Sequence, residues 1–188
     1  MPTHVALLRG INVGGGGKLP MADLRQLVTS LGHADVATYI QSGNVVFTPS
    51  SPADPAELAA SLRSAISESL GLDPPVVVVS RDELASVIAS NPYPDEPKPQ
   101  YVHCVFLATE PDGSARSKVD EIVSATTGGT RDELTVLGRT VYLHTPDGFG
   151  NSELSKALLA KRNSPLAGAT ARNWATVTKL LAMCDGPS

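Results

Sequence analysis

The chain has 188 residues, 41% of them hydrophobic, and a formal net charge of −4. This length allows one domain or two small ones, and the mild negative charge argues against a dedicated duplex nucleic-acid binder. No apolar run approaches the ~20 residues of a membrane span and no signal-peptide pattern opens the chain, so we expect a cytoplasmic protein without a membrane partner.

The chain opens with a predicted strand, a glycine-rich loop and a helix. Residues 4–8 read as a short buried strand, and apolar residues from Met21 to Leu31 repeat on one helical face after Pro20. Between them lies a loop with four consecutive glycines, residues 14–17, flanked by Arg9 and Lys18. Such a loop can hold an anion on its backbone N–H groups. The alternative interpretation is a plain flexible connection.

The loop matches neither of two common phosphate-binding motifs. A P-loop ending at Gly17-Lys18 needs glycine at 12 and a hydroxyl at 19, where the chain has Asn12 and Leu19. A dinucleotide fingerprint starting at Gly14 also needs glycine at 19. We therefore expect this loop to bind an anion through contacts that differ from those of a P-loop or a dinucleotide-binding site.

The rest of the first half alternates predicted strands and helices. In chain order these are a strand at 36–40, a strand at 44–48, a helix at 58–70, a strand at 76–79 and a helix after Ser80. A polar turn, Gln41-Ser42-Gly43, joins the first two strands. The order β-α-β-β-α-β is that of a ferredoxin-like fold.

Residues 91–100 separate the chain into two halves. Four prolines in this segment exclude a continuous helix or a central strand, so we predict a semi-rigid linker. The predicted domains are therefore a first α+β half at 1–90, the linker at 91–100 and a second half at 101–188.

The second half repeats the start of the first. The predicted elements are a strand at 101–107, a helix around 119–123, a hairpin at 134–143 and two helices near 154–161 and 171–183. Gly138-Arg139 forms the hairpin turn. We predict an α+β fold of two tandem ferredoxin-like, two-layer halves, the alternative being one continuous sheet. Cys104 and Cys184 lie in apolar runs and read as buried thiols.

Three motifs in this order resemble the bacterial "domain of unknown function 1697" family. They are Arg9-Gly10-Ile11-Asn12-Val13-Gly14-Gly15, Tyr39-Ile40-Gln41-Ser42-Gly43-Asn44-Val45, and Thr170-Ala171-Arg172-Asn173-Trp174 with Thr178-Lys179-Leu180. The resemblance runs from Val5 to about Leu181 and implies an α+β fold with ferredoxin-like elements, but no activity. The chain departs from the family at Gly16, Gly17 and Ala175, where polar residues are common, and near 150–154, where the family is more basic.

The motifs supply a hypothetical ligand site. We expect a small phosphate- or carboxylate-bearing ligand in a cleft between the glycine-rich loop and the C-terminal helix, whose N-cap is predicted to be Thr170. The candidate ligand-binding residues are Arg9, Asn12, Gly14, Gly15, Lys18, Gln41, Ser42, Asn44, Arg172 and Asn173. As the alternative, Arg172 and Asn173 brace the C-terminal helix, and the turn residues meet only the backbone demands of a tight turn.

Catalysis and cofactors find little support in the sequence. The four histidines, two cysteines and paired acids form no metal-ligand, nucleophile-elbow or acid/base pattern, so we expect no metal and no cofactor. Whether the protein is an enzyme stays open. The sequence leaves two alternative functions. One is single-stranded RNA binding on a ferredoxin-like sheet, although only 4% of residues are aromatic. The other is a structural module that forms homo-oligomers.

Overall fold

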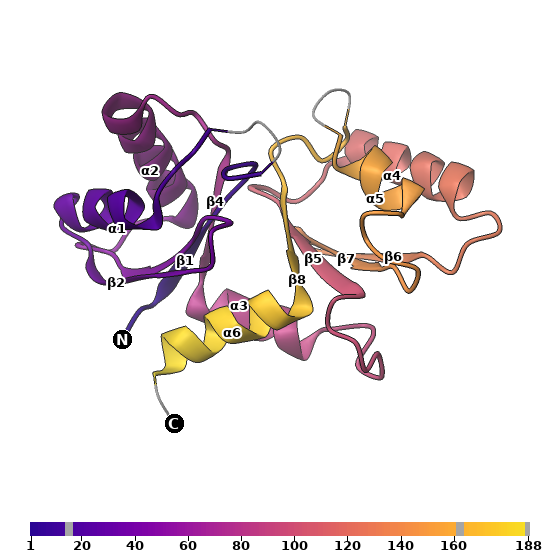
Figure 1. Cartoon of the computed structure of the whole chain (residues 1–188). Helices are drawn as coiled ribbons and strands as arrows, with labels where there is room; N and C mark the ends of the chain where they lie inside the picture. Colours follow the sequence, from indigo (N-terminus) through magenta and orange to yellow (C-terminus); the bar gives the residue numbers. More distant parts are fainter. Residues whose placement is uncertain (14–16, 161–163, 187–188) are drawn as a thin grey trace. The chain divides into compact units, whose positions relative to one another are not determined.

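The computed structural model describes residues 1–13, 17–160 and 164–186 (Figure 1). The chain divides into two compact units, one formed by Met1–Ile88 with Thr178–Ser188 and the other by Ala89–Val177. The described residues form two four-stranded antiparallel sheets and six helices, which confirms the predicted mixture of helices and strands. The domain boundaries at 90 and 100 stay a prediction.

The first unit places two helices on one face of its sheet (Figure 1). Its elements are β1 (His4–Leu8), α1 (Met21–Ser30), β2 (Ala34–Tyr39), β3 (Asn44–Thr48), α2 (Pro55–Leu70), β4 (Val76–Ser80) and α3 (Arg81–Ala89). The strand order is β2-β3-β1-β4, with antiparallel neighbours. Alternate strand residues and the apolar faces of α1 and α2 form the core, which includes Ala6, Leu8, Val45, Phe47, Leu24, Val28, Leu62 and Ile66.

The second unit has the same order of elements up to its fourth strand. They are β5 (Val102–Phe106), α4 (Gly113–Thr126), β6 (Glu133–Leu137), β7 (Thr140–His144), α5 (Glu153–Leu158), β8 (Thr170–Asn173) and α6 (Trp174–Asp185). The strand order is β6-β7-β5-β8. Helix α6 begins in this unit, and its residues from Thr178 belong to the first unit.

The predicted helix at 171–183 is wrong at its start. Residues 170–173 form β8, which pairs with β5, and the helix begins at Trp174. The Asn173 side chain, rather than Thr170, accepts the first-turn hydrogen bond, from the Thr176 N–H at 2.9 Å. Pairing with a neighbouring strand overrides the helical propensity of Ala171 and Arg172.

The two units also share their strand register. His4 pairs with Ser80 in the first sheet, and His103 pairs with Asn173 in the second. Ser80 and Asn173 each end an edge strand, and each side chain accepts the backbone N–H three residues further on. The same residue position therefore closes a strand and starts a helix in both units.

The proline-rich segment is held against the second unit. It contains no helix or strand, but Glu96 Oε2 lies 2.7 Å from His144 Nε2, and the Tyr93 ring stacks on the His144 ring at 5.0 Å. The Trp174 N–H donates to the Pro99 carbonyl. The hydrogen bonds from His144 and from the Lys98 N–H lower the pKa of Glu96.

Acid should destabilise the second unit through His103. Its ring stacks on Phe149 at 3.8 Å, and burial lowers its pKa to about 4. A histidine in the unfolded chain has a pKa of about 6.5 and binds the proton first, so stability is lost as pH falls from about 6.5 toward the folded value. We expect His103 to contribute a loss of about 2 kcal/mol between pH 8 and pH 5, measured by urea unfolding. The variant His103→Phe keeps a ring there and should reduce the loss of stability in acid by about this amount; an unchanged loss would assign the effect to other groups.

Candidate functional site

Left-handed backbone conformations gather where β1 ends and the β2–β3 hairpin turns. Gly10, Asn12, Ile40 and Gly43 have φ values of 71°, 54°, 52° and 77°. Glycine adopts this conformation freely and asparagine tolerates it, but a β-branched isoleucine is strained there. The Ile40 side chain is also 50% exposed. Strained backbone persists mainly at sites where function or tight packing requires it.

Asn12 joins the two loops. Its Nδ2 donates to the carbonyls of Leu19 and Gln41 at 2.8 Å each, and its Oδ1 accepts from the Leu19 N–H at 2.8 Å. The Leu8 N–H adds a bond to the Gly43 carbonyl at 2.8 Å. The Asn12 amide is thus used to hold the β1–α1 loop against the hairpin turn.

Replacing Asn12 with alanine should lower the free energy of unfolding by about 2 kcal/mol, because three backbone groups lose their partner and alanine is disfavoured at this φ. The variant Asn12→Gly suits the backbone but forms none of the three bonds. Asn12→Gly should therefore still lose part of the free energy of unfolding. Urea unfolding of both variants separates the effect of the hydrogen bonds from that of the backbone conformation. Wild-type stability in the glycine variant would contradict a stabilising role of the hydrogen bonds.

The polar residues of the hairpin turn serve the turn itself. Asn44 is fully buried, and its Nδ2 donates to the Tyr39 carbonyl and to Ser42 Oγ at 3.0 Å each. Gln41 is exposed, and its carbonyl accepts from Asn12. These contacts agree with the turn interpretation of the motif.

A pocket of roughly 390 Å³ lies at the start of α1. It is lined by Asn12, Lys18, Leu19, Pro20, Met21, Ala22, Arg25 and Gln41. Pro20 occupies the N-cap position and supplies no side-chain hydrogen bond, and the first helical bond is accepted by its carbonyl from the Leu24 N–H. The uncapped first turn of α1 therefore lines the pocket, and the positive end of the helix dipole lies there.

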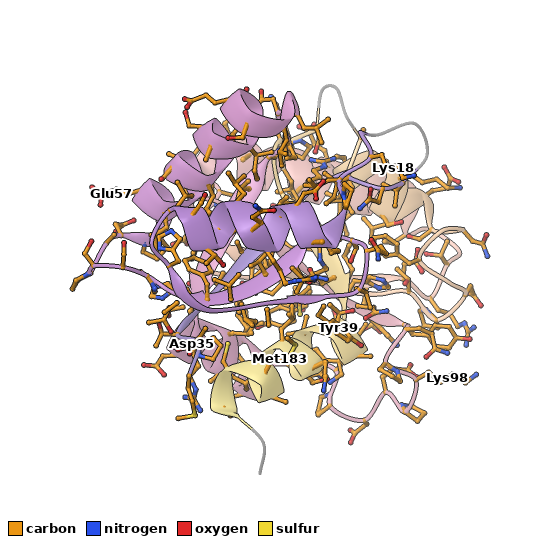
Figure 2. All side chains as sticks on the ribbon, turned by 60° about the vertical axis from the view of Figure 1, so that its left-hand side comes forward. Lys18, Asp35, Tyr39, Glu57, Lys98 and Met183 are labelled. Atoms are coloured by element: carbon orange, nitrogen blue, oxygen red, sulfur yellow. The ribbon has the colours of Figure 1, made fainter. Side chains whose placement is uncertain are left out.

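Two cations line this pocket. Lys18 lies just before the first turn of α1 (Figure 2) and has no ion-pair partner among the described residues. Arg25 Nη1 donates to Thr38 Oγ1 at 2.7 Å. Asp23, exposed in the same helical turn, is a nearby negative charge. Arg9 is half-buried, and burial lowers its pKa.

The structure brings together only some of the predicted site residues. Asn12, Lys18 and Gln41 line one pocket, and Ser42 and Asn44 belong to the adjoining turn. Gly14 and Gly15 lie outside the described residues. Arg25 is a pocket residue that sequence reasoning missed. A helix starting near residue 20 places Arg25 one turn above that start, so the helical period could have indicated it.

Arg172 and Asn173 are described within the second unit. Arg172 is 8% exposed, and its Nη1 donates to Thr170 Oγ1 at 2.7 Å and to the Ala171 carbonyl at 2.8 Å. Burial lowers its pKa to about 10, so the side chain is charged at neutral pH. Asn173 caps α6. Both side chains make hydrogen bonds that support the fold of their own unit.

Metal-binding and membrane-spanning features are lacking in the part of the chain that the structure describes. Within those residues, no group of three or more histidine, cysteine, aspartate or glutamate side chains could hold a metal ion. No helix there has the length and apolar character needed to cross a membrane. Burial raises the pKa of the Cys104 thiol to about 12 and that of Cys184 to about 11, so neither is a reactive thiolate at neutral pH.

The comparisons with known proteins find relatives of unknown function. Residues 1–142 match the family described as "Protein of unknown function (DUF1697)". Among solved structures, the conserved bacterial protein SP0830 from Streptococcus pneumoniae is 24% identical, with a TM-score of 0.73 over 97% of this chain and 98% of that one. This similarity shows a shared fold. No curated protein matches the chain.

Proposed function

The chain belongs to the family described as "Protein of unknown function (DUF1697)", and from that premise we propose that its first unit binds a small phosphate- or carboxylate-bearing ligand in the pocket at the start of α1. The observation that carries the proposal is an uncapped helix N-terminus beside Lys18 and Arg25. First-turn N–H groups without a side-chain cap among the described residues, the helix dipole and two cations all favour a negative charge at this place.

The second unit provides an internal comparison. Its equivalent helix, α4, is capped by Asp112, whose Oδ1 accepts the Ala115 N–H at 2.8 Å. The loop before it also carries Glu110, which pairs with Arg116 at 2.5 Å. Negative side chains thus occupy the position that is open and flanked by cations in the first unit. The shared order of strands and helices therefore does not by itself produce an uncapped helix start flanked by cations.

We assign Arg172 and Asn173 to the fold of the second unit instead of to the ligand. Their hydrogen bonds to Thr170, to Ala171 and within α6 support this choice. RNA binding gains no comparable support, because the β1 residues Val5 and Leu7, on the face away from the α1 and α2 core, are apolar and fully buried. An oligomerisation role likewise has no specific observation in its favour.

The expected result is a thermal stabilisation by inorganic phosphate or acetate that depends on Lys18. A ligand at a hundredfold its Kd adds about 2.7 kcal/mol, a rise of roughly 5–10 °C in Tm for a chain of this size. Tm is measured against each anion at constant ionic strength. Lys18→Ala should lose most of the rise in Tm. Asp23→Asn should bind the anion more tightly, because it removes a negative charge near the pocket.

Lys118→Ala is the matched control, since it removes one exposed lysine from α4 in the second unit. It should keep the full rise, which separates binding at the pocket from the general stabilising effect of phosphate as a salt. Equal rises in the wild type, Lys18→Ala and Lys118→Ala would reject the pocket as the site. No rise with either anion would reject both ligand classes.

We also infer that each unit is ferredoxin-like and that the two arose by duplication. The β-α-β-β-α-β order, the matching strand orders and the equivalent registers of His4 and His103 support this. The glycine-rich loop is then a feature of the first copy.

A further inference from the structure

His33 is buried at the start of β2 and bound to the segment that follows β3. The residue is 8% exposed, and its ring lies 5.0 Å from the Phe47 ring. The Ser50 N–H donates to its Nδ1 at 3.2 Å. Its Nε2 is buried with no hydrogen-bond partner among the described residues.

This hydrogen bond fixes the protonation state of the ring. A nitrogen that accepts an N–H must carry its lone pair, so the neutral ring holds its proton on Nε2. When a proton from solvent adds to Nδ1, the acceptor becomes a donor facing the Ser50 N–H. The bond to Ser50 is then lost, and the buried ring carries a charge without a partner.

No acid among the described residues forms an ion pair with His33. His4 on β1 lies against the same Phe47 ring, at 6.0 Å between ring centroids, and its pKa is lowered by burial and by His33. Burial also lowers the pKa of His33 itself. The acids closest in sequence to His33 and Ser50 have other partners: Asp35 binds the Met1 amino group and Thr48 Oγ1, and Asp54 and Glu57 form the capping box of α2.

We infer that His33 is an acid-operated latch: uptake of one proton on Nδ1 releases Ser50 and the connection between β3 and α2 from the start of β2. The connection spans residues 49–54, and Ala53 within it packs on the core of the first unit. Release therefore loosens the entry to α2 in the first unit.

Native-state hydrogen exchange at the Ser50 amide tests the latch. If the ring cannot take up a proton while its bond to Ser50 is formed, the protection factor should fall about tenfold for each pH unit below the pKa of a free histidine. That pKa is about 6.5, so the fall should be about tenfold at pH 5.5. His33→Asn places a non-titrating acceptor oxygen near the same N–H, and its Ser50 protection should stay constant over this range. His4→Asn keeps the latch and should keep the fall.

A second measurement uses the unchanged protein. Ring nitrogen chemical shifts at pH 7.5 should report a His33 with its proton on Nε2 and none on Nδ1. A proton on Nδ1 at that pH would overturn the inference. So would a Ser50 protection factor that stays constant in the wild type, or one that falls equally in His33→Asn.

Discussion

Replacing Gly43 with alanine should lower the free energy of unfolding by about 3 kcal/mol. The glycine has a φ of 77°, a region that costs an L-residue energy. A Cβ at this position would lie 2.6 Å from Ile11 Cδ1 and 2.8 Å from Leu8 Cβ. Both neighbours are core residues, 3% and 1% exposed, so they have little room to move. Urea unfolding measures the loss.

Gly10 offers the matched control for this prediction. It has a similar φ of 71°, but a Cβ there would meet nothing within 4 Å. Gly10→Ala should therefore cost only the backbone term, about 1 kcal/mol, and the difference from Gly43→Ala measures the overpacking against Leu8 and Ile11. Equal losses in the two variants would contradict the packing argument.

The elements that the sequence predicted well are those whose core face is apolar. The continuous run of valines in β4 is typical of a strand buried on both faces, and the spaced leucines of α2 match the helical period; the structure buries both sets. The strand β8 was missed because its four residues carry no such pattern, and only pairing with β5 selects the extended conformation. Long-range pairing cannot be read from a local period.

The ligand site between the glycine-rich loop and the C-terminal helix stays a prediction, and the contacts of its loop residues could be predicted only in part. The motifs around Asn12 and Gln41 indicated two loops, and the structure joins these loops through the Asn12 amide. In the second unit the loop that follows β5 is also joined to the hairpin turn, but here the side chain comes from the turn. Arg139, in the β6–β7 turn, donates to the carbonyls of Leu107 and Ala108. Two different side chains perform the same connection, so no residue type at a fixed position could have indicated it.

The strained conformation of Ile40 could not be predicted at all. Isoleucine favours strands, and the sequence interpretation placed it at the end of one. Its φ of 52° arises because the hairpin turn must bring the Gln41 carbonyl to Asn12 and the Gly43 carbonyl to Leu8. Tertiary hydrogen bonds here outweigh a local preference.

Arg172→Ala should lower the free energy of unfolding by about 3 kcal/mol. The truncation leaves a cavity at a residue that is only 8% exposed, and it removes the donor to Thr170 Oγ1 and the Ala171 carbonyl. Arg172→Met fills most of the volume and also removes the buried charge, so it should lose less than about 1 kcal/mol. Urea unfolding of both variants measures the losses.

The methionine variant also decides between the two interpretations of Arg172. A side chain that supports the fold and does not contact the ligand leaves anion binding unchanged, so Arg172→Met should show the same phosphate-dependent rise in Tm as the wild type. A stable Arg172→Met that loses this rise would instead place the guanidinium in contact with the ligand. That result would contradict the assignment of Arg172 to the fold.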